Sequence, residues 1–527
     1  MYRPIATSAI ALIIGAGPVL ADVTPSQVWD SLQQTYGQMG YDMQVGATDD
    51  AGQTLTVTDL VLTPREGEKD ITLTIPRIVM QQTGGGDVRS VVEGQMDLQM
   101  KGRTEEDKPV GFTMSIDAPG NETLTTGTPE AMEHAITVPK MIVNGRSQDK
   151  VNETPLTITL TDMAAKQATS QAEDGTRSQS FEGTVATTVM AINASGPAHV
   201  EPTDQPADQS ADQPEDAPQP DPENLPMDSF SSNVTLDDLE FKGQGTLPAG
   251  DFDMASDPSG ALKAGYSGQV TFAMGKVQGD FRATSHGVAE DRTNNAEGSF
   301  GIEDGTMAMA MDKDSLSYEG KAEQIAVQMT SDDLPFPIEY TAAENTFRLA
   351  MPMIASEQEQ PFALAYGLKD LALNDQIWQA IDPQSTLPRD PASLNIDLEG
   401  MAVLVTDFLD PGFADPETDK APFQPRQLTI KDISLDAVGA TADITGDLAF
   451  GDDPSQPVGT VQGRFTGINA LLDNAVAMGI APEQQMMGVR MMMAMFARPA
   501  QDDPETLTTE LEFREGGSIF ANGQQVK

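Results

Sequence analysis

The segment Leu55-Thr56-Val57-Thr58-Asp59-Leu60-Val61-Leu62 contains the most informative pattern in the chain. Its apolar residues occupy odd positions before Asp59 and even positions after it. Because side chains of a strand alternate between two faces, an uninterrupted strand would place the second half on the wrong face. A β-bulge at the aspartate would insert one extra residue and return these side chains to the core face. The segment therefore predicts a bulged antiparallel strand.

The same pattern recurs along the chain around four other aspartates, and segments of alternating polar and apolar residues lie between the copies. Glycine, proline and asparagine separate these segments, as expected for turns. We therefore predict a mainly β protein, with one or more long curved antiparallel sheets of bulged strands and a few short packing helices. The copies of the pattern are Ile158–Met163, Val234–Phe241, Tyr366–Leu373 and Leu428–Leu435.

A few segments have helical spacing instead. Thr24 is a suitable N-cap before Pro25, and apolar residues follow at helical intervals up to Tyr36. Further helices are predicted at residues 375–381 and as two segments within 468–497. Asn144-Gly145 follows an apolar run and predicts a hairpin turn.

Composition argues against several functional classes. The chain has 81 acidic and 31 basic residues and a formal charge of −50, which disfavours binding to nucleic acid. It has no cysteine, which excludes disulfides, thiolate catalysis and cysteine-ligated zinc. The histidines at 134, 199 and 286 are widely separated. We therefore expect no enzyme and no catalytic, cofactor or metal residue; a hydrolase that uses paired carboxylates is the alternative.

The predicted organisation begins with a secretory signal peptide at residues 1–21, cleaved before Asp22. Residues 22–196 and 227–527 form the N-terminal and C-terminal parts of a β-rich domain. Between them, residues 197–226 are rich in proline and acidic side chains and predict a disordered insert. It lies either between strands of one sheet or between two domains. The processed chain is expected in the periplasm or outside the cell, without a transmembrane helix.

Methionines are concentrated in two segments, a predicted strand and a predicted helix. Methionine is flexible and polarizable, so a surface built from it can adapt to apolar ligands of varied shape. A packed core helix and a copper(I) site are the other interpretations. The candidate apolar-ligand surface comprises Met307, Met309 and Met311 in the strand and Met486, Met487, Met491, Met492 and Met495 in the helix.

Several motifs resemble those of domain-of-unknown-function family 2125, a group of alphaproteobacterial envelope proteins. They are Asp22–Pro25 with Val28-Trp29, Leu55–Leu62, Leu387–Leu394 and Gly516–Gly523. The resemblance spans most of the chain after the signal peptide, except the acidic insert, and implies an envelope protein. It implies no site residue, because none of these motifs has a known chemical role.

The bulged repeat is also similar to repeats of AsmA-like envelope proteins, which implies a curved sheet that holds lipid in an apolar groove. Three hypotheses follow for function. The protein holds lipid or another apolar ligand on its sheet, or it holds another envelope protein, or it is the carboxylate-dependent hydrolase. The sequence favours the first two and leaves the oligomeric state open.

Overall fold

The computed structural model describes most of the chain between residues 23 and 527. The predicted signal peptide lies outside the described residues, and so do residues 199–224 of the predicted insert. The described ranges are 23–38, 40–65, 71–103, 109–147, 154–198, 225–250, 257–287, 292–410, 413, 421–451, 453–501 and 503–527.

Strands dominate the structure, and one antiparallel sheet of 26 strands contains all those in the described ranges. The helices are α1 (Pro25–Gln38), α2 (Pro258–Lys263), α3 (Asp375–Ile381), α4 (Ile468–Ala477), α5 (Glu483–Phe496) and a 3-10 turn at Glu515–Gly517. The first eleven strands are β1 (Tyr41–Asp50), β2 (Thr54–Pro64), β3 (Ile71–Gln82), β4 (Val88–Glu93), β5 (Met96–Arg103), β6 (Pro109–Asp117), β7 (Glu122–Thr128), β8 (Ala131–Ser147), β9 (Leu156–Gln171), β10 (Arg177–Pro197) and β11 (Met227–Leu247). The others are β12 (Ser267–Met274), β13 (Val277–Gly287), β14 (Arg292–Ile302), β15 (Asp304–Met311), β16 (Leu316–Ser331), β17 (Ile338–Met351), β18 (Gln360–Leu373), β19 (Ala392–Leu404), β20 (Phe423–Ala437), β21 (Ala440–Ala449), β22 (Val458–Thr466), β23 (Arg498–Pro499), β24 (Leu507–Arg514), β25 (Ser518–Ala521) and β26 (Gln524–Gln525).

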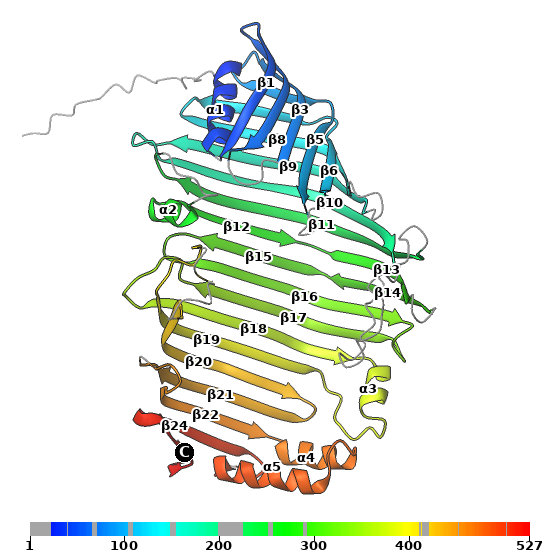
Figure 1. Ribbon diagram of the computed structural model, residues 1–527, viewed down its shortest axis with the longest axis vertical. Helices are drawn as coiled ribbons and strands as arrows, with labels where there is room; N and C mark the ends of the chain where they lie inside the picture. The colour runs from blue at the N-terminus through cyan, green and yellow to red at the C-terminus, as the bar shows by residue number, and fades with distance from the viewer. Residues whose placement is uncertain are drawn as a thin grey trace, which may run out of the picture.

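The strands stack along the long axis of the molecule, so that the sheet is elongated (Figure 1). The mainly β fold with antiparallel strands and few helices is thus as predicted. From β8 to β11 and from β16 to β22, each strand pairs with the next one in sequence. In four places a long strand faces two half-strands laid end to end. β4 and β5 both pair with β3, and β6 and β7 both pair with β8. β12 and β13 both pair with β11, and β14 and β15 both pair with β16.

The predicted change of phase at Asp59 is confirmed. Leu55 and Val57 before it and Leu60 and Leu62 after it are all buried. The predicted cause is wrong at this position, because the register with β1 and β3 is the same on both sides of Asp59. No extra residue is inserted; instead Asp59 adopts a left-handed backbone with φ of +53°.

The neighbouring strands change phase in the same place, which is why the register is preserved. Gly46 of β1 lies opposite Asp59, where a Cβ would come within 2.8 Å of the Asp59 Cβ. Pro76 of β3 lies on the other side and has no N–H to donate to the interrupted ladder. The same left-handed conformation occurs at Asp162, Asp238, Gln324 and Asp370, with φ between 51° and 53°. At Asp370 the register against β19 also shifts by one residue, as the predicted bulge requires.

A true bulge is found at Asp432. The register of β20 shifts by one residue against both β19 and β21 at Lys431-Asp432, as predicted. The Asp432 carboxylate accepts hydrogen bonds from the side chains of Asn395 (2.5 Å) and Ser434 (3.0 Å).

Closed hydrophobic clusters lie on limited parts of the sheet. α1 packs Val28 and Trp29 onto β1, β2 and β3, as expected for this amphipathic helix. A second cluster joins Leu262 of α2 with Leu316 and Met353. α2 itself was not predicted, although Asp257 caps it and Pro258 opens it.

Other local predictions have mixed outcomes. Helices α3, α4 and α5 lie where the sequence predicts them. The hairpin turn at Asn144-Gly145 is wrong, because both residues continue β8 and pair with β9. β10 and β11, which flank the predicted insert, pair with each other up to Pro197 and Met227. The division of the chain into parts around the insert remains a prediction.

A candidate ligand-binding face of the sheet

Apolar side chains form two adjacent rows across the middle of the sheet. In the first row, Phe241, Phe272, Met307, Gly320 and Phe347 are successive cross-strand partners on β11, β12, β15, β16 and β17. Cross-strand partners lie on the same face, so these side chains share one surface. Tyr366 of β18 continues the row.

The second row lies two residues further along each strand and therefore on the same face. Its successive partners are Phe181, Gly243, Val270, Met309, Tyr318, Leu349 and Leu364, on β10 to β18. Six strand-to-strand steps of about 4.8 Å make the second row about 30 Å long, and the first row is one step shorter. We call the surface formed by these two rows the apolar face.

The apolar face is largely open in the described structure. Met307 is 43% exposed, Phe347 41% and Leu364 46%, although residues of these types normally lie inside a protein. The cluster that includes Leu262 of α2 covers only one edge of the face, near Met311 and Tyr318. A contiguous apolar surface of this length is typical of a binding site.

Glycines beneath the aromatic rings make this face smooth. Phe241 lies over Gly183, where a Cβ would be 2.5 Å from the Phe241 Cζ. Phe181 lies in the same way over Gly243, with a corresponding distance of 2.4 Å. Because the glycine has no side chain, the ring can lie along the neighbouring strand instead of standing up from the sheet. The rings thus cover backbone that would otherwise be exposed.

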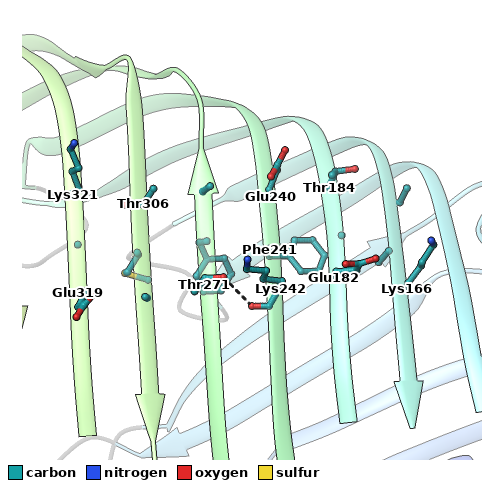
Figure 2. A pocket seen from close by; sticks show the side chains of 18 of the residues that line it. Lys166, Glu182, Thr184, Glu240, Phe241, Lys242, Thr271, Thr306, Glu319 and Lys321 are labelled. Atoms are coloured by element: carbon teal, nitrogen blue, oxygen red, sulfur yellow. Dashed lines mark hydrogen bonds between the residues drawn. The ribbon is translucent and has the colours of Figure 1, made fainter. Parts of the chain in front are cut away.

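The residues that line a hollow of about 1120 Å³ across β8 to β17 come from the first apolar row and from the two largely polar rows on either side of it (Figure 2). Lys166, Glu182 and Lys242 are cross-strand partners in one row. Thr184 and Glu240 are partners in the other. Glu240 and Lys242 flank Phe241 in sequence, so their side chains, and those of their cross-strand partners, lie on the face opposite the first apolar row. The sheet is therefore two-sided.

Several charged side chains on the face opposite the apolar face, which we call the polar face, form ion pairs. The Lys321 ammonium lies 2.5 Å from Glu323 and 2.9 Å from Glu344, and hydrogen bonds to these carboxylates raise the pKa of Lys321. Arg348 contacts Glu399 at 3.2 Å, and Lys431 also pairs with Glu399. The hydrogen bond from Lys431 is the main cause that lowers the pKa of Glu399.

The described carboxyl groups that have a resolved pKa shift, Asp407 and Asp503 among them, all have a lowered pKa. A general acid that works near neutral pH requires a raised pKa. The same described ranges contain no group of three or more histidine, aspartate or glutamate side chains that could hold a metal ion.

Two histidines make local hydrogen bonds. Burial lowers the pKa of His134, whose Nδ1 lies 2.9 Å from the Thr125 hydroxyl. His286 Nδ1 lies 3.2 Å from the Asp228 carboxylate. Neither contact includes a serine, as a Ser-His-Asp site would.

The predicted methionines do not form one site. Met307 and Met309 lie on the apolar face, whereas Met311 packs against the cluster of Leu262. The other five lie on α5, beside β24, at the end of the sheet (Figure 1). β15 and β24 are eight strand-to-strand steps apart, or about 40 Å. Met487, Met491, Met492 and Met495 are exposed there, and Met486 is less so.

The sequence did not reveal the aromatic part of the surface. Phe181, Phe241 and Phe347 were not predicted as site residues, although each lies in a strand with alternating side chains. Repeated Phe-x-Gly motifs were the available signal, as in Phe181-Glu182-Gly183 and Phe241-Lys242-Gly243.

A family model described as "Uncharacterized protein conserved in bacteria (DUF2125)" matches residues 270–520. Residues 270–520 are thus similar to that family. The DUF2125 region begins within β12 and contains the methionines of β15 and α5, together with the motif Leu387–Leu394. The motifs at Asp22–Pro25 and Leu55–Leu62 lie outside it. Searches of the curated proteins and of the solved structures found no significant match.

The described helices are all too short or too polar to cross a membrane.

Proposed function

We propose that this protein is exported, catalyses no reaction, and holds a lipid acyl chain along its apolar face. The observation that carries the proposal is the pair of exposed apolar rows that continue over β10 to β18. The proposed export rests on the signal-like sequence of residues 1–21.

The dimensions of the face fit an acyl chain. An acyl chain that spans one leaflet is about 15 Å long, half of the hydrocarbon core. The two rows extend about 30 Å, so the face is long enough to accommodate the whole chain. Flat phenylalanine rings and flexible methionines can adjust to such a chain, which has no polar group to specify its position. Burial of this surface from water is the driving force for binding.

Another envelope protein is the second candidate occupant. An apolar patch of this kind also serves as a protein interface, with aromatic and methionine residues at its centre. The charged opposite face, with Lys166, Glu182 and Lys242, would then remain in solvent. We favour lipid because the exposed rows offer few hydrogen-bonding groups, whereas a typical protein interface makes several hydrogen bonds.

The test is purification of the full chain without detergent, followed by native mass spectrometry and by organic extraction. A bound lipid is expected in both. Met309→Asp and Leu364→Asp place a charge on the apolar face and should lower lipid occupancy about tenfold or more. Met227→Asp is the matched control, because Met227 is an exposed methionine of β11 outside both rows. Absence of lipid and of binding to an apolar fluorescent probe would reject the proposal in favour of a protein partner.

A further inference from the structure

The helical hairpin α4–α5 has an unusual distribution of apolar side chains. None of its residues is buried, although most of them are apolar. The less exposed side of α5 carries Met486, Val489 and Met493. Its outward side carries Met487, Met491, Met492 and Met495, of which Met491 is 68% exposed. A surface helix normally presents polar residues to solvent, so this orientation is inverted.

The outward stripe of α5 is continuous and uncharged. Met487, Met491 and Met495 follow one another at intervals of four residues, and Met492 and Phe496 lie beside them at the same interval. Ile480, in the turn between the helices, is also 68% exposed. The charged residue of this part of α5, Arg490, pairs instead with Asp473 of α4.

The hairpin is firmly attached to the sheet. The carbonyl of Phe496 at the end of α5 accepts hydrogen bonds from the side chains of Thr509 (2.5 Å) and Asn522 (2.9 Å). The following residues, Arg498–Pro499, form β23 and pair with β24. The apolar stripe is therefore held in place at the tip of the molecule, at the opposite end from α1 (Figure 1).

Charge identifies the occupant that fits this surface. Residues 467–499 carry two acidic side chains, Asp473 and Glu483, and two basic ones, Arg490 and Arg498, so their net charge is zero in a chain of −50. A second copy of the chain would bring another −50 to the same place, and the two copies would repel each other. The interface of a zwitterionic bilayer is uncharged overall and accepts apolar side chains from a helix that lies in its plane.

We propose that the outward stripe of α5, together with Ile480, inserts into the interfacial region of a zwitterionic lipid bilayer. The protein then stands with the C-terminal end of its sheet at the membrane. This docking does not depend on a lipid held by the apolar face. If both proposals hold, docking brings that face close to a source of acyl chains.

Flotation of the purified full chain with phosphatidylcholine vesicles tests the proposal. The protein should float with the vesicles, and Met491→Glu or Met487→Glu should each weaken the partition by about tenfold or more, because one buried methionine side chain is lost. Glutamate is a helix former like methionine, so α5 should remain helical, and circular dichroism checks this. Met227→Glu, on β11, should float like the unchanged protein. Replacing part of the phosphatidylcholine by phosphatidylglycerol should weaken flotation, because the chain is acidic.

A second measurement does not depend on weakening the interaction. Phe496→Trp places an indole on the stripe, and brominated phosphatidylcholine should quench its fluorescence. The unchanged protein, which contains Trp29 and Trp378, is the control, and the quenching should be stronger in the variant. The proposal is overturned if the full chain does not float, if Met491→Glu floats as well as the unchanged protein, or if light scattering finds a dimer that Met491→Glu dissociates. Absence of bound lipid from the purified unchanged chain, with intact flotation, would reject only the proposal for the apolar face, so the two proposals can fail separately.

Discussion

Phe347 lies directly over Gly320, its cross-strand partner, so closely that a Cβ on the glycine would be 2.1 Å from the Phe347 Cε1. The ring therefore occupies the space that a side chain at position 320 would need. Gly320→Ala must displace the ring, and we expect a loss of about 1–3 kcal/mol in the free energy of unfolding. Urea denaturation monitored by circular dichroism measures this loss.

A double-mutant cycle isolates this contact. In a Phe347→Ala background, Gly320→Ala should be nearly neutral, because no ring has to move. Gly268→Ala is the control, since a Cβ there has only the Tyr266 hydroxyl nearby, at 3.9 Å. Equal effects of Gly320→Ala in both backgrounds would show that the ring does not depend on the glycine.

Substitutions at Asp59 test the left-handed backbone conformation of this residue. Its φ of +53° suits asparagine and glycine but not a β-branched residue. Asp59→Asn should therefore be nearly neutral, whereas Asp59→Val should lower the free energy of unfolding by about 1–3 kcal/mol. Asp49→Val, at an exposed position of β1 without a positive φ, is the control and should change stability little. The same result for valine at both positions would contradict the assignment.

Asp432 tests the bulge. Asp432→Val removes the acceptor of the Asn395 and Ser434 side chains and should cost about 1–2 kcal/mol. Asp436→Val, on an exposed residue of the same strand, should cost much less. Thermal unfolding of the two variants gives the comparison, and a smaller loss for Asp432→Val than for Asp436→Val would refute the role of these hydrogen bonds.

The Asp382 carboxylate is expected to make the free energy of unfolding depend on pH. It is fully buried, and its carboxylate accepts a hydrogen bond from the Leu387 N–H at 2.8 Å. This hydrogen bond is the main cause that lowers its pKa, and the charge of Arg389 adds to it. A folded pKa below the unfolded value of about 3.9 means that the stabilisation is present above that pH and is lost as the pH falls through the folded pKa.

Asp382→Asn should therefore be less stable than the unchanged protein at pH 7, and the difference should shrink as the medium becomes more acidic than about pH 4. The urea midpoint measured across this range shows the effect. Asp375→Asn is the control, because the Asp375 side chain is 86% exposed beside Arg389, and its difference should stay small at each pH. A difference for Asp382→Asn that does not vary with pH would show that the carboxylate is not stabilising in its charged form.

Removal of the signal peptide is the last prediction. The basic Arg3, the short apolar run and the small residue at Ala21 predict cleavage before Asp22. The intact mass of protein released from the periplasm of its own cell should correspond to a chain that starts at Asp22. A mass that retains Met1–Ala21 would contradict cleavage, and absence of the protein from the periplasm would contradict the export step of the proposed function.

Local patterns were sufficient for much of the fold. Alternation identified strands such as β3, β9 and β16, and helical spacing located α1 and α3. The phase change at Asp59 was visible as well, but its mechanism was not. A bulge in one strand and a left-handed residue matched by changes in both neighbours give the same apolar pattern along a single strand. The difference lies in the pairing with Gly46 and Pro76, which is a non-local property.

The candidate site was harder to predict, because it depends on register. Met307 and Met309 were identified from their composition, whereas Phe241 and Phe347 become part of the same surface only when five strands are placed side by side. The error at Asn144-Gly145 has a related cause. Gly145 is required within β8 because the Phe112 ring lies against it, with Cζ 2.7 Å from a Cβ at that position, so a turn-like dipeptide serves cross-strand packing.

The pairing of each strand from β16 to β22 with its successor has a consequence for how such a molecule folds and evolves. Contacts between sequence neighbours close only short loops, so ordering can spread from one hairpin to the next. Stability then accumulates approximately per hairpin, as in repeat proteins. Duplication or deletion of one hairpin would change the length of the sheet by about 10 Å and leave the remaining connections intact. The span of the surface is thus adjustable in small genetic steps.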